Sequence, residues 1–152
     1  MPLKPDKKRL EFLRSDFVQG FPAYCGFTVD HISAGCFETG LLVRSEHRQQ
    51  DGFIHAGVLA TMADHTAGYA AYTLVPETAR ILSIEFKINF FKPAVGSRLH
   101  CRSKVISPGR QILVAESNLY AQLENEEKHV ARATVTLMAV EADRLTRSEK
   151  SA

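Results

Sequence analysis

The stretch from His55 to Ala71, HAGVLATMADHTAGYAA, is almost entirely small or apolar, yet it carries Asp64 and His65 near its centre. Its pattern predicts one long helix from about residue 56 to residue 74. Apolar residues would lie on nearly every side of that helix, so it must be covered all round. A membrane span is disfavoured, because two ionisable groups in the middle of the lipid would be costly. We therefore expect a buried helix of a soluble protein.

Around this helix the chain alternates in the manner of strands. Residues 5–18 place Leu10, Leu13 and Phe17 at helical spacing, which predicts a short amphipathic helix that ends near Gly20 and Pro22. A hairpin is expected at 25–33 and 36–45, and four further strands at 81–91, 97–106, 111–124 and 129–140. A polar loop at 47–57 leads into the long helix.

The strand expected at 81–91 alternates cleanly between apolar and polar residues. One face would carry Leu82, Ile84, Phe86, Ile88 and Phe90, and the other Ser83, Glu85, Lys87 and Asn89. The alternation therefore predicts that Ser83 points away from the apolar face.

This order of elements predicts an α+β fold, in which a curved antiparallel sheet of five to six strands wraps the long helix. A second copy of the chain would cover what the sheet leaves open. We expect an N-terminal helix and linker at 1–22, the main domain at 23–141, and a charged C-terminal tail at 142–152 without regular structure.

The composition excludes several classes of protein. The 152 residues include 19 Lys and Arg and 17 Asp and Glu, a net charge of +2 without a basic stripe, which argues against nucleic-acid binding. Cys25, Cys36 and Cys101 have no C-x-x-C spacing, so neither a disulfide framework nor a metal site is expected. The first residues carry no secretory signal, and we expect a cytoplasmic protein without a membrane partner.

Helical geometry separates the candidate groups. Asp64 lies nine positions beyond His55, roughly 13 Å along the axis and about half a turn out of phase. If both residues serve one site, that site must be shared between two chains. The start of the helix at His55, Ala56 and Gly57 offers unpaired N–H groups, which suit a carbonyl oxygen that gains negative charge. Asp64 could activate water there, whereas His65 points elsewhere and is expected to be structural.

The stretch from Gln49 to Asp64, QQDGFIHAGVLATMAD, resembles the signature of hotdog-fold acyl-CoA thioesterases of the PaaI-like branch. That pattern has Asn or Gln, then His-Gly-Gly six residues on, then Asp or Glu nine residues after the His. The resemblance extends over about residues 26–140 and includes FFKPAVGSRL and SPGRQILVAESNLY. It implies the hotdog fold and hydrolysis of acyl- or aryl-CoA thioesters, with no cofactor and no metal.

The same resemblance implies a role for each matched position. Asp64 of one chain would be the general base or the nucleophile, and the N–H of Ala56 of the partner chain would polarise the thioester oxygen. Gln49 would orient either the water or the thioester, and His55 would shape the loop. Ser83 matches a serine that helps to position water in some relatives. These sites imply a homodimer, expected to double to a homotetramer.

One position departs from the family pattern, because this chain has His-Ala-Gly in place of His-Gly-Gly. A helix start has ordinary negative φ, so we expect Ala56 to remain a working donor with less room for the thioester. The CoA phosphates could meet Lys92 and Arg110, with Arg80 and Lys104 as weaker candidates, and Gly109 could let the backbone approach the pantetheine arm. The acyl pocket would draw on Val58, Leu59 and Met62.

Two other functions stay open at this point. A non-catalytic acyl-CoA-binding module would keep the fold and the groove without turnover. A hotdog hydratase or dehydratase would act on enoyl or hydroxyacyl thioesters, although its D-x-N-P-x-H pattern does not occur in this sequence.

Overall fold

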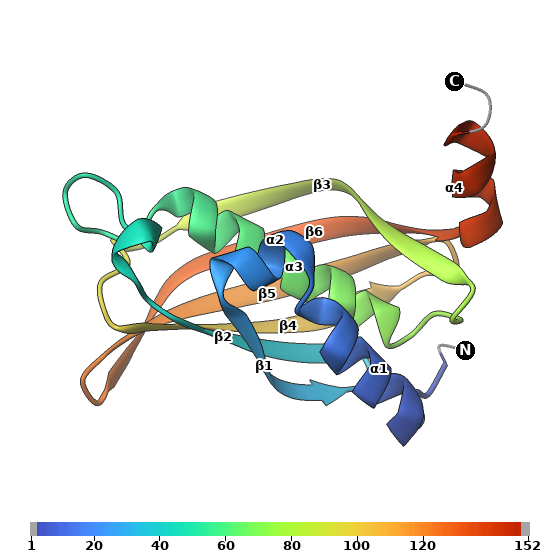
Figure 1. The fold of residues 1–152 in the computed structure, drawn as a ribbon, viewed down its shortest axis with the longest axis horizontal. Helices are drawn as coiled ribbons and strands as arrows, with labels where there is room; N and C mark the ends of the chain where they lie inside the picture. The colour runs from blue at the N-terminus through green and yellow to red at the C-terminus, as the bar shows by residue number, and fades with distance from the viewer. Residues whose placement is uncertain (1–2, 150–152) are drawn as a thin grey trace.

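Within residues 3–149, which the computed structural model describes, six antiparallel strands wrap around the long helix α3 (Ala56–Tyr72) (Figure 1). The order across the sheet is β1-β2-β4-β5-β6-β3. The strands are β1 (Phe27–Ser33), β2 (Cys36–Leu42), β3 (Ala79–Phe90), β4 (Arg98–Pro108), β5 (Ile112–Leu123) and β6 (Glu126–Glu141). The predicted α+β class and the hotdog architecture are confirmed, and α3 ends two residues before the predicted limit.

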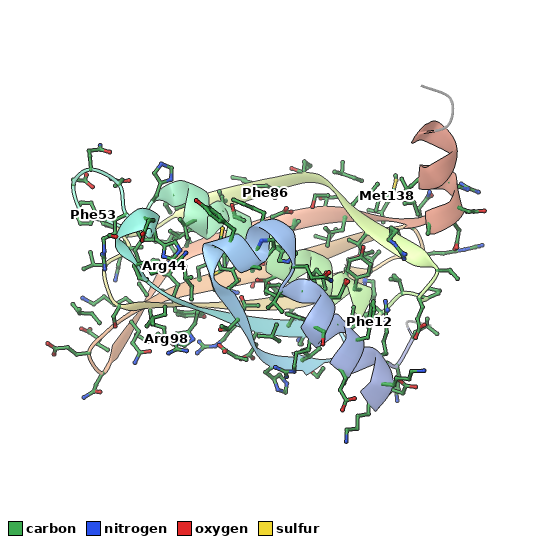
Figure 2. All side chains as sticks on the ribbon, in the orientation of Figure 1. Phe12, Arg44, Phe53, Phe86, Arg98 and Met138 are labelled. Atoms are coloured by element: carbon green, nitrogen blue, oxygen red, sulfur yellow. The ribbon has the colours of Figure 1, made fainter. Side chains whose placement is uncertain are left out.

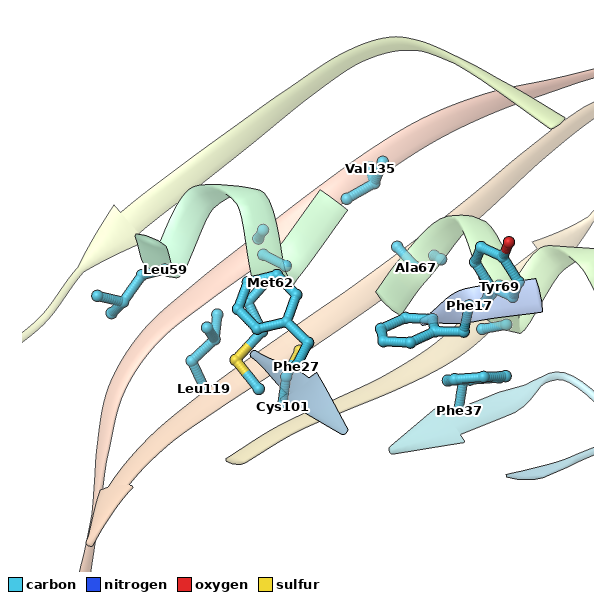
Figure 3. Close-up of a cluster of buried hydrophobic side chains, with 14 of the residues drawn as sticks. Phe17, Phe27, Phe37, Leu59, Met62, Ala67, Tyr69, Cys101, Leu119 and Val135 are labelled. Carbon is cyan, nitrogen blue, oxygen red and sulfur yellow. The ribbon is translucent and has the colours of Figure 1, made fainter. Parts of the chain in front are cut away.

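The main core lies between α3 and the concave side of the sheet (Figure 3). Leu59 and Met62 of α3 are buried there, as are Leu119 of β5 and Val135 of β6. Because α3 carries small residues such as Ala63 and Ala67 on its buried sides, the sheet can approach it closely.

Two N-terminal helices complete the core. Helix α1 (Lys7–Phe17) begins at the N-cap Asp6, whose carboxylate accepts a hydrogen bond of 2.7 Å from the Arg9 N–H. Leu13 and Phe17 are fully buried, as their helical spacing predicts. Helix α2 (Gly20–Cys25) is absent from the sequence prediction, because Gly20 and Pro22 are typical of a helix end. Both residues instead lie in the first turn of a new helix, where proline is tolerated. The proposed domain limit at 22 falls inside this helix.

The alternation predicted along β3 is wrong at Leu82 and Ser83. A register shift between Ser83 and Glu85 makes Ile84 an extra residue in the pairing with β6. Ser83 pairs with the buried Leu137, and Phe86 pairs with the buried Val135, so Ser83 lies on the face that looks toward α3. Leu82 lies on the opposite face. The bulge therefore brings a hydroxyl group, and not a leucine, to the helix.

The two edges of the sheet differ in how well they are protected against pairing with a further strand. At the β1 edge the Arg14 side chain donates a hydrogen bond of 2.8 Å to the Val29 carbonyl, and a register shift follows directly between Val29 and His31. Both features discourage further strand pairing. The β3 edge is longer and pairs with β6 on one side only. It carries exposed apolar side chains, among them Ile84, which is 52% exposed, and Phe86, which is 39% exposed (Figure 2).

The C-terminal tail differs from the prediction of an irregular segment. Residues Ala142–Glu149 form helix α4, and residues 150–152 of the predicted tail lie outside the described part. The helix is anchored where it begins, because the Ala142 N–H donates to the Thr78 carbonyl at 2.9 Å. Asp143 in the first turn also suits the positive end of the helix dipole. No helix among the described residues has the length and apolar character required to cross a membrane.

Candidate active site

The start of α3 leaves one backbone donor open. His55 is the N-cap, and its Nδ1 accepts a hydrogen bond of 2.8 Å from the Gly57 N–H. A Cβ on Gly57 would lie 2.9 Å from that nitrogen, so a larger residue would push the His55 ring out of its capping position. Within the described residues no hydrogen bond reaches the Ala56 N–H, and Ala56 is exposed. The His55 cap thus removes Gly57 from the predicted set of free donors and leaves Ala56.

The alanine at position 56 is compatible with this role. Glu124 is the one non-glycine residue with positive φ in the described part of the chain, so Ala56 has the ordinary negative φ expected at a helix start. The departure from the family glycine therefore does not strain the backbone.

The loop before the helix brings Gln49 to the same place. Gln49 and Ala56 line one cavity of about 410 Å³ together with apolar residues that include Phe53, Leu59 and Phe90. Phe53 lies on this loop at the end of the molecule where α3 begins (Figure 2). Val58 and Met62, which were expected near the acyl group, belong to the core side of α3.

Asp64 and Ser83 form a second group further along the helix. The Ser83 hydroxyl donates a hydrogen bond of 2.6 Å to Asp64 Oδ1. Asp64 is half-buried and Ser83 is exposed, so this pair faces the open side of α3 beside the β3 edge. Ser83 accounts for one acceptor site of the carboxylate, and in the described part of the chain no other hydrogen bond reaches the Asp64 side chain, so its other sites can accept from a water molecule or a substrate.

The two groups are separated within one chain. Asp64 is eight residues beyond Ala56 in a continuous helix, which places the two about 12 Å apart along its axis. One chain therefore brings Gln49, His55 and Ala56 together and brings Asp64 and Ser83 together, but does not join the two groups.

The cations expected for a phosphate-bearing ligand occupy different places. Lys92 lines the Gln49 cavity and also a neighbouring cavity of about 340 Å³. Arg110 and Arg144 line a cavity of about 600 Å³ at the Ala79 end of β3, whereas Lys92 follows the Phe90 end. The Arg80 side chain donates hydrogen bonds to the carbonyl groups of Glu77 and Ala79. Lys104 is an exposed residue of β4.

The turn between β4 and β5 explains why residue 109 is a glycine. A Cβ at this position would collide with the carbonyl of Ile112 across the turn between β4 and β5. The turn therefore requires glycine whether or not a ligand approaches it.

His65 lies on another side of α3, against helix α1. Its Nε2–H donates to the Phe17 carbonyl at 3.1 Å, and its ring lies 4.3 Å from the Phe17 ring and 4.9 Å from the Tyr69 ring. Burial lowers the pKa of His65, which favours the neutral ring. The surroundings of His65 agree with the structural role expected for it.

Two polar residues near the site are absent from the sequence prediction. Asp51 lies between Gln49 and His55 in the sequence and accepts a hydrogen bond of 2.9 Å from the Gln49 side chain. Ser117 is buried beneath α3, and its hydroxyl group donates a hydrogen bond of 2.7 Å to the carbonyl of Ala63, the residue before Asp64. Asp51 looked like an ordinary loop residue, and Ser117 like one polar position of an alternating strand.

Comparison with known proteins identifies the relatives of this chain. The thioesterase superfamily model matches residues 51–128, just over half of the chain. The esterase-named protein SSO1253 of Saccharolobus solfataricus is 32% identical over 69 residues, which is 45% of this chain and 45% of that protein. The chain thus matches less than half the length of this relative.

Solved structures share the fold over most of its length. A thioesterase family protein from Silicibacter pomeroyi is 38% identical and superposes with a TM-score of 0.85, covering 88% of this chain and 99% of that one. Thioesterase HI1161 from Haemophilus influenzae is 20% identical with a TM-score of 0.80, covering 91% of this chain and 95% of that one. With a matching model that covers more than half of its residues, this chain belongs to the thioesterase superfamily.

Proposed function

We propose that the protein is a PaaI-like acyl-CoA thioesterase whose active sites are each completed by two copies of the chain. The observation that carries this proposal is the separation of the two groups. A carboxylate held by Ser83 lies about 12 Å along α3 from the open Ala56 amide. Neither group can act on the thioester bound by the other unless a second chain supplies the missing half.

The β3 edge supports such a dimer. If β3 of one chain pairs with β3 of another in antiparallel fashion, its Phe90 end lies beside the Ala79 end of the partner strand. In this arrangement the first turn of α3 of one chain lies toward the middle of α3 of the partner chain. The exposed apolar side chains of β3 would be covered, which agrees with the rule that large exposed apolar patches mark interfaces. Doubling of this dimer to a tetramer stays a prediction.

The chemistry follows from the two groups. The thioester carbonyl oxygen accepts the Ala56 N–H, where the helix start stabilises the negative charge that develops on it. Asp64 of the partner removes a proton from water, whose oxygen bonds to the carbonyl carbon; in the alternative, the Asp64 carboxylate attacks the carbon itself. Collapse of the tetrahedral intermediate breaks the carbon–sulfur bond in both routes, and the thiolate of CoA leaves and takes up a proton. Water attack yields the free acid directly, with the proton returned from Asp64. Carboxylate attack leaves the acyl group on Asp64 as a mixed anhydride, which a water molecule then hydrolyses to the free acid.

The cations support a phosphate-bearing leaving group. Lys92 borders the cavity that holds Ala56, and Arg110 lies beyond the opposite end of β3. In the antiparallel dimer the Arg110 end of one chain approaches the Lys92 end of the other, so both cations can face the CoA phosphates of one substrate. The cysteines are free, which supports a reducing compartment such as the cytoplasm.

The proposal is tested with a panel of acyl- and aryl-CoA thioesters while the released thiol is measured. We expect hydrolysis of some members, and a loss of about a hundred-fold or more in kcat for Asp64→Asn, since general-base catalysis contributes about that much. Asp30→Asn, a change of the same kind on β1, serves as the matched control and should keep full activity.

The rival functions give different results in the same assay. A binding module would be protected against thermal unfolding by acyl-CoA without releasing thiol. A hydratase would consume the double bond of enoyl-CoA and leave the thioester intact. Full hydrolysis by a folded Asp64→Asn protein would contradict the role of Asp64.

A further inference from the structure

The loop between η1 (Ser45–His47) and α3 is tightly closed by its own hydrogen bonds. The Gln49 N–H donates to the Phe53 carbonyl at 2.8 Å, and the Gly52 N–H donates to the Gln49 carbonyl at 3.0 Å. Gly52 has φ of +88°, which the turn requires and which other residues rarely adopt. Arg48 donates to the carbonyl groups of Gly52 and Gly96, both at 3.0 Å, and so ties the loop to the segment after β3.

Asp51 connects this closed backbone to the side chain of Gln49. Its Oδ1 accepts the Phe53 N–H at 3.4 Å, and its Oδ2 accepts the Gln49 Nε2–H at 2.9 Å. A carboxylate can only accept hydrogen bonds, so the amide group of Gln49 must turn its nitrogen toward Asp51. The orientation of the amide is therefore determined by its partner.

Gln49 and Asp51 both line the cavity that contains Ala56. With its nitrogen held by Asp51, the amide of Gln49 has no partner for its oxygen among residues 3–149, so that oxygen can accept a hydrogen bond. The negative charge beside the N–H polarises the amide and makes that oxygen a stronger acceptor. A water molecule that must donate one proton to a base can donate its second hydrogen to such an oxygen.

We propose that Asp51 is a positioning residue, which orients Gln49 so that its oxygen binds the attacking water and not the thioester. This inference rests on the proposed thioesterase function. The water oxygen bonds to the carbonyl carbon, one proton passes to Asp64 of the partner chain, and the other hydrogen stays bonded to Gln49 Oε1 during the attack. The thiol leaves as in the general mechanism. In this role Asp51 acts through its hydrogen bond to Gln49 and takes no part in bonding to the reacting atoms.

The test is a double-mutant cycle on the full-length protein, with kcat and KM measured for one accepted acyl-CoA. We expect Asp51→Ala to lower kcat about three- to ten-fold, the value of one hydrogen bond, with KM unchanged within about two-fold. Asp51→Asn keeps an oxygen that can accept from Gln49 and should restore most of the rate. In the Gln49→Ala background, Asp51→Ala should cause no further loss, because the residue that it positions is absent.

Gln50→Ala is the matched control, since Gln50 is an exposed neighbour on the same loop. It should retain wild-type kcat and KM. The role of Asp51 is overturned if Asp51→Ala keeps full kcat, or if its loss appears in KM and thermal stability and adds fully to that of Gln49→Ala. Undiminished activity of Gln49→Ala itself would instead contradict the proposed active site.

Discussion

Ser83 donates a hydrogen bond of 2.6 Å to Asp64, a residue nineteen positions earlier in the sequence. The bond exists because the bulge in β3 turns Ser83 toward α3, whereas regular alternation would have turned Leu82 there. The carboxylate on the helix and the hydroxyl group on the edge strand thus form one unit on the open side of the chain. This unit is half of the site that we propose.

The first prediction concerns this bond. Ser83→Ala removes a donor to a carboxylate, and we expect kcat to fall about ten- to a hundred-fold, since a hydrogen bond to a charged group contributes about 1.5–3 kcal/mol. Ser83→Thr keeps the hydroxyl group and should retain most of the rate. Leu82→Ala lies on the other face of β3 and serves as the control. Equal rates for Ser83→Ala and the wild type would remove Ser83 from the site.

The second prediction concerns the β3 edge. Ile84→Asp places a charge in each of two strands that we expect to pair, and their repulsion and desolvation should separate the dimer into monomers. Hydrolysis should be lost with it. Leu42→Asp, a charge on a side chain that is 65% exposed on β2, should change neither property. Light scattering coupled to gel filtration measures the mass, and an intact dimer of Ile84→Asp would contradict pairing through β3.

The third prediction concerns the hydroxyl groups beneath α3. Ser103 and Ser117 are buried and lie 2.6 Å apart, and Ser117 donates to the Ala63 carbonyl. Ser117→Ala leaves the Ser103 hydroxyl group without this partner, and we expect the free energy of unfolding to fall by about 1–3 kcal/mol. The double variant of Ser103 and Ser117 should lose less than the sum of the single losses. Urea denaturation measures all three variants, and full additivity would show that the two hydroxyl groups act independently.

The fourth prediction concerns pH. Burial against α1 lowers the pKa of His65 below its ordinary value of 6.5, despite the opposing effects of the hydrogen bond to the Phe17 carbonyl and of the charges on Asp64 and Asp16. Below pH 6.5 His65 is protonated more readily in the unfolded chain than in the folded chain. The contribution of neutral His65 to the free energy of unfolding is therefore complete above pH 6.5 and is lost as the pH falls below it. The Tm of the wild type should drop more between pH 7.5 and pH 5.5 than that of His65→Gln. An equal drop in both proteins would contradict this linkage.

Much of the fold could be predicted from periodicity. The spacing of Leu13 and Phe17 located α1, and the apolar composition of residues 56–72 correctly required a helix covered by a sheet. Each of these signals repeats over several residues and survives local irregularity. The position of Ser83 depends on one inserted residue, which breaks the alternation without changing the composition of the strand. No periodic pattern could reveal it.

The candidate site was only partly predictable, for a similar reason. Spacing alone indicated that Asp64 and His55 could not meet in one chain, since helix geometry is fixed. That His55 caps Gly57, and that Asp51 holds Gln49, depends on side-chain directions in a short irregular loop. Such directions are determined by individual hydrogen bonds, which the sequence does not encode as a pattern.

The central claim is that each active site takes Gln49 and Ala56 from one chain and Asp64 from another, and mixed dimers test it directly. Each of the Asp64→Asn and Gln49→Ala homodimers should have strongly reduced activity. A heterodimer purified through two different affinity tags contains one site with both residues intact and one site with neither. It should therefore recover about half of the wild-type kcat per dimer, since one of the two symmetric sites is restored. A heterodimer no more active than its parents would contradict a shared site.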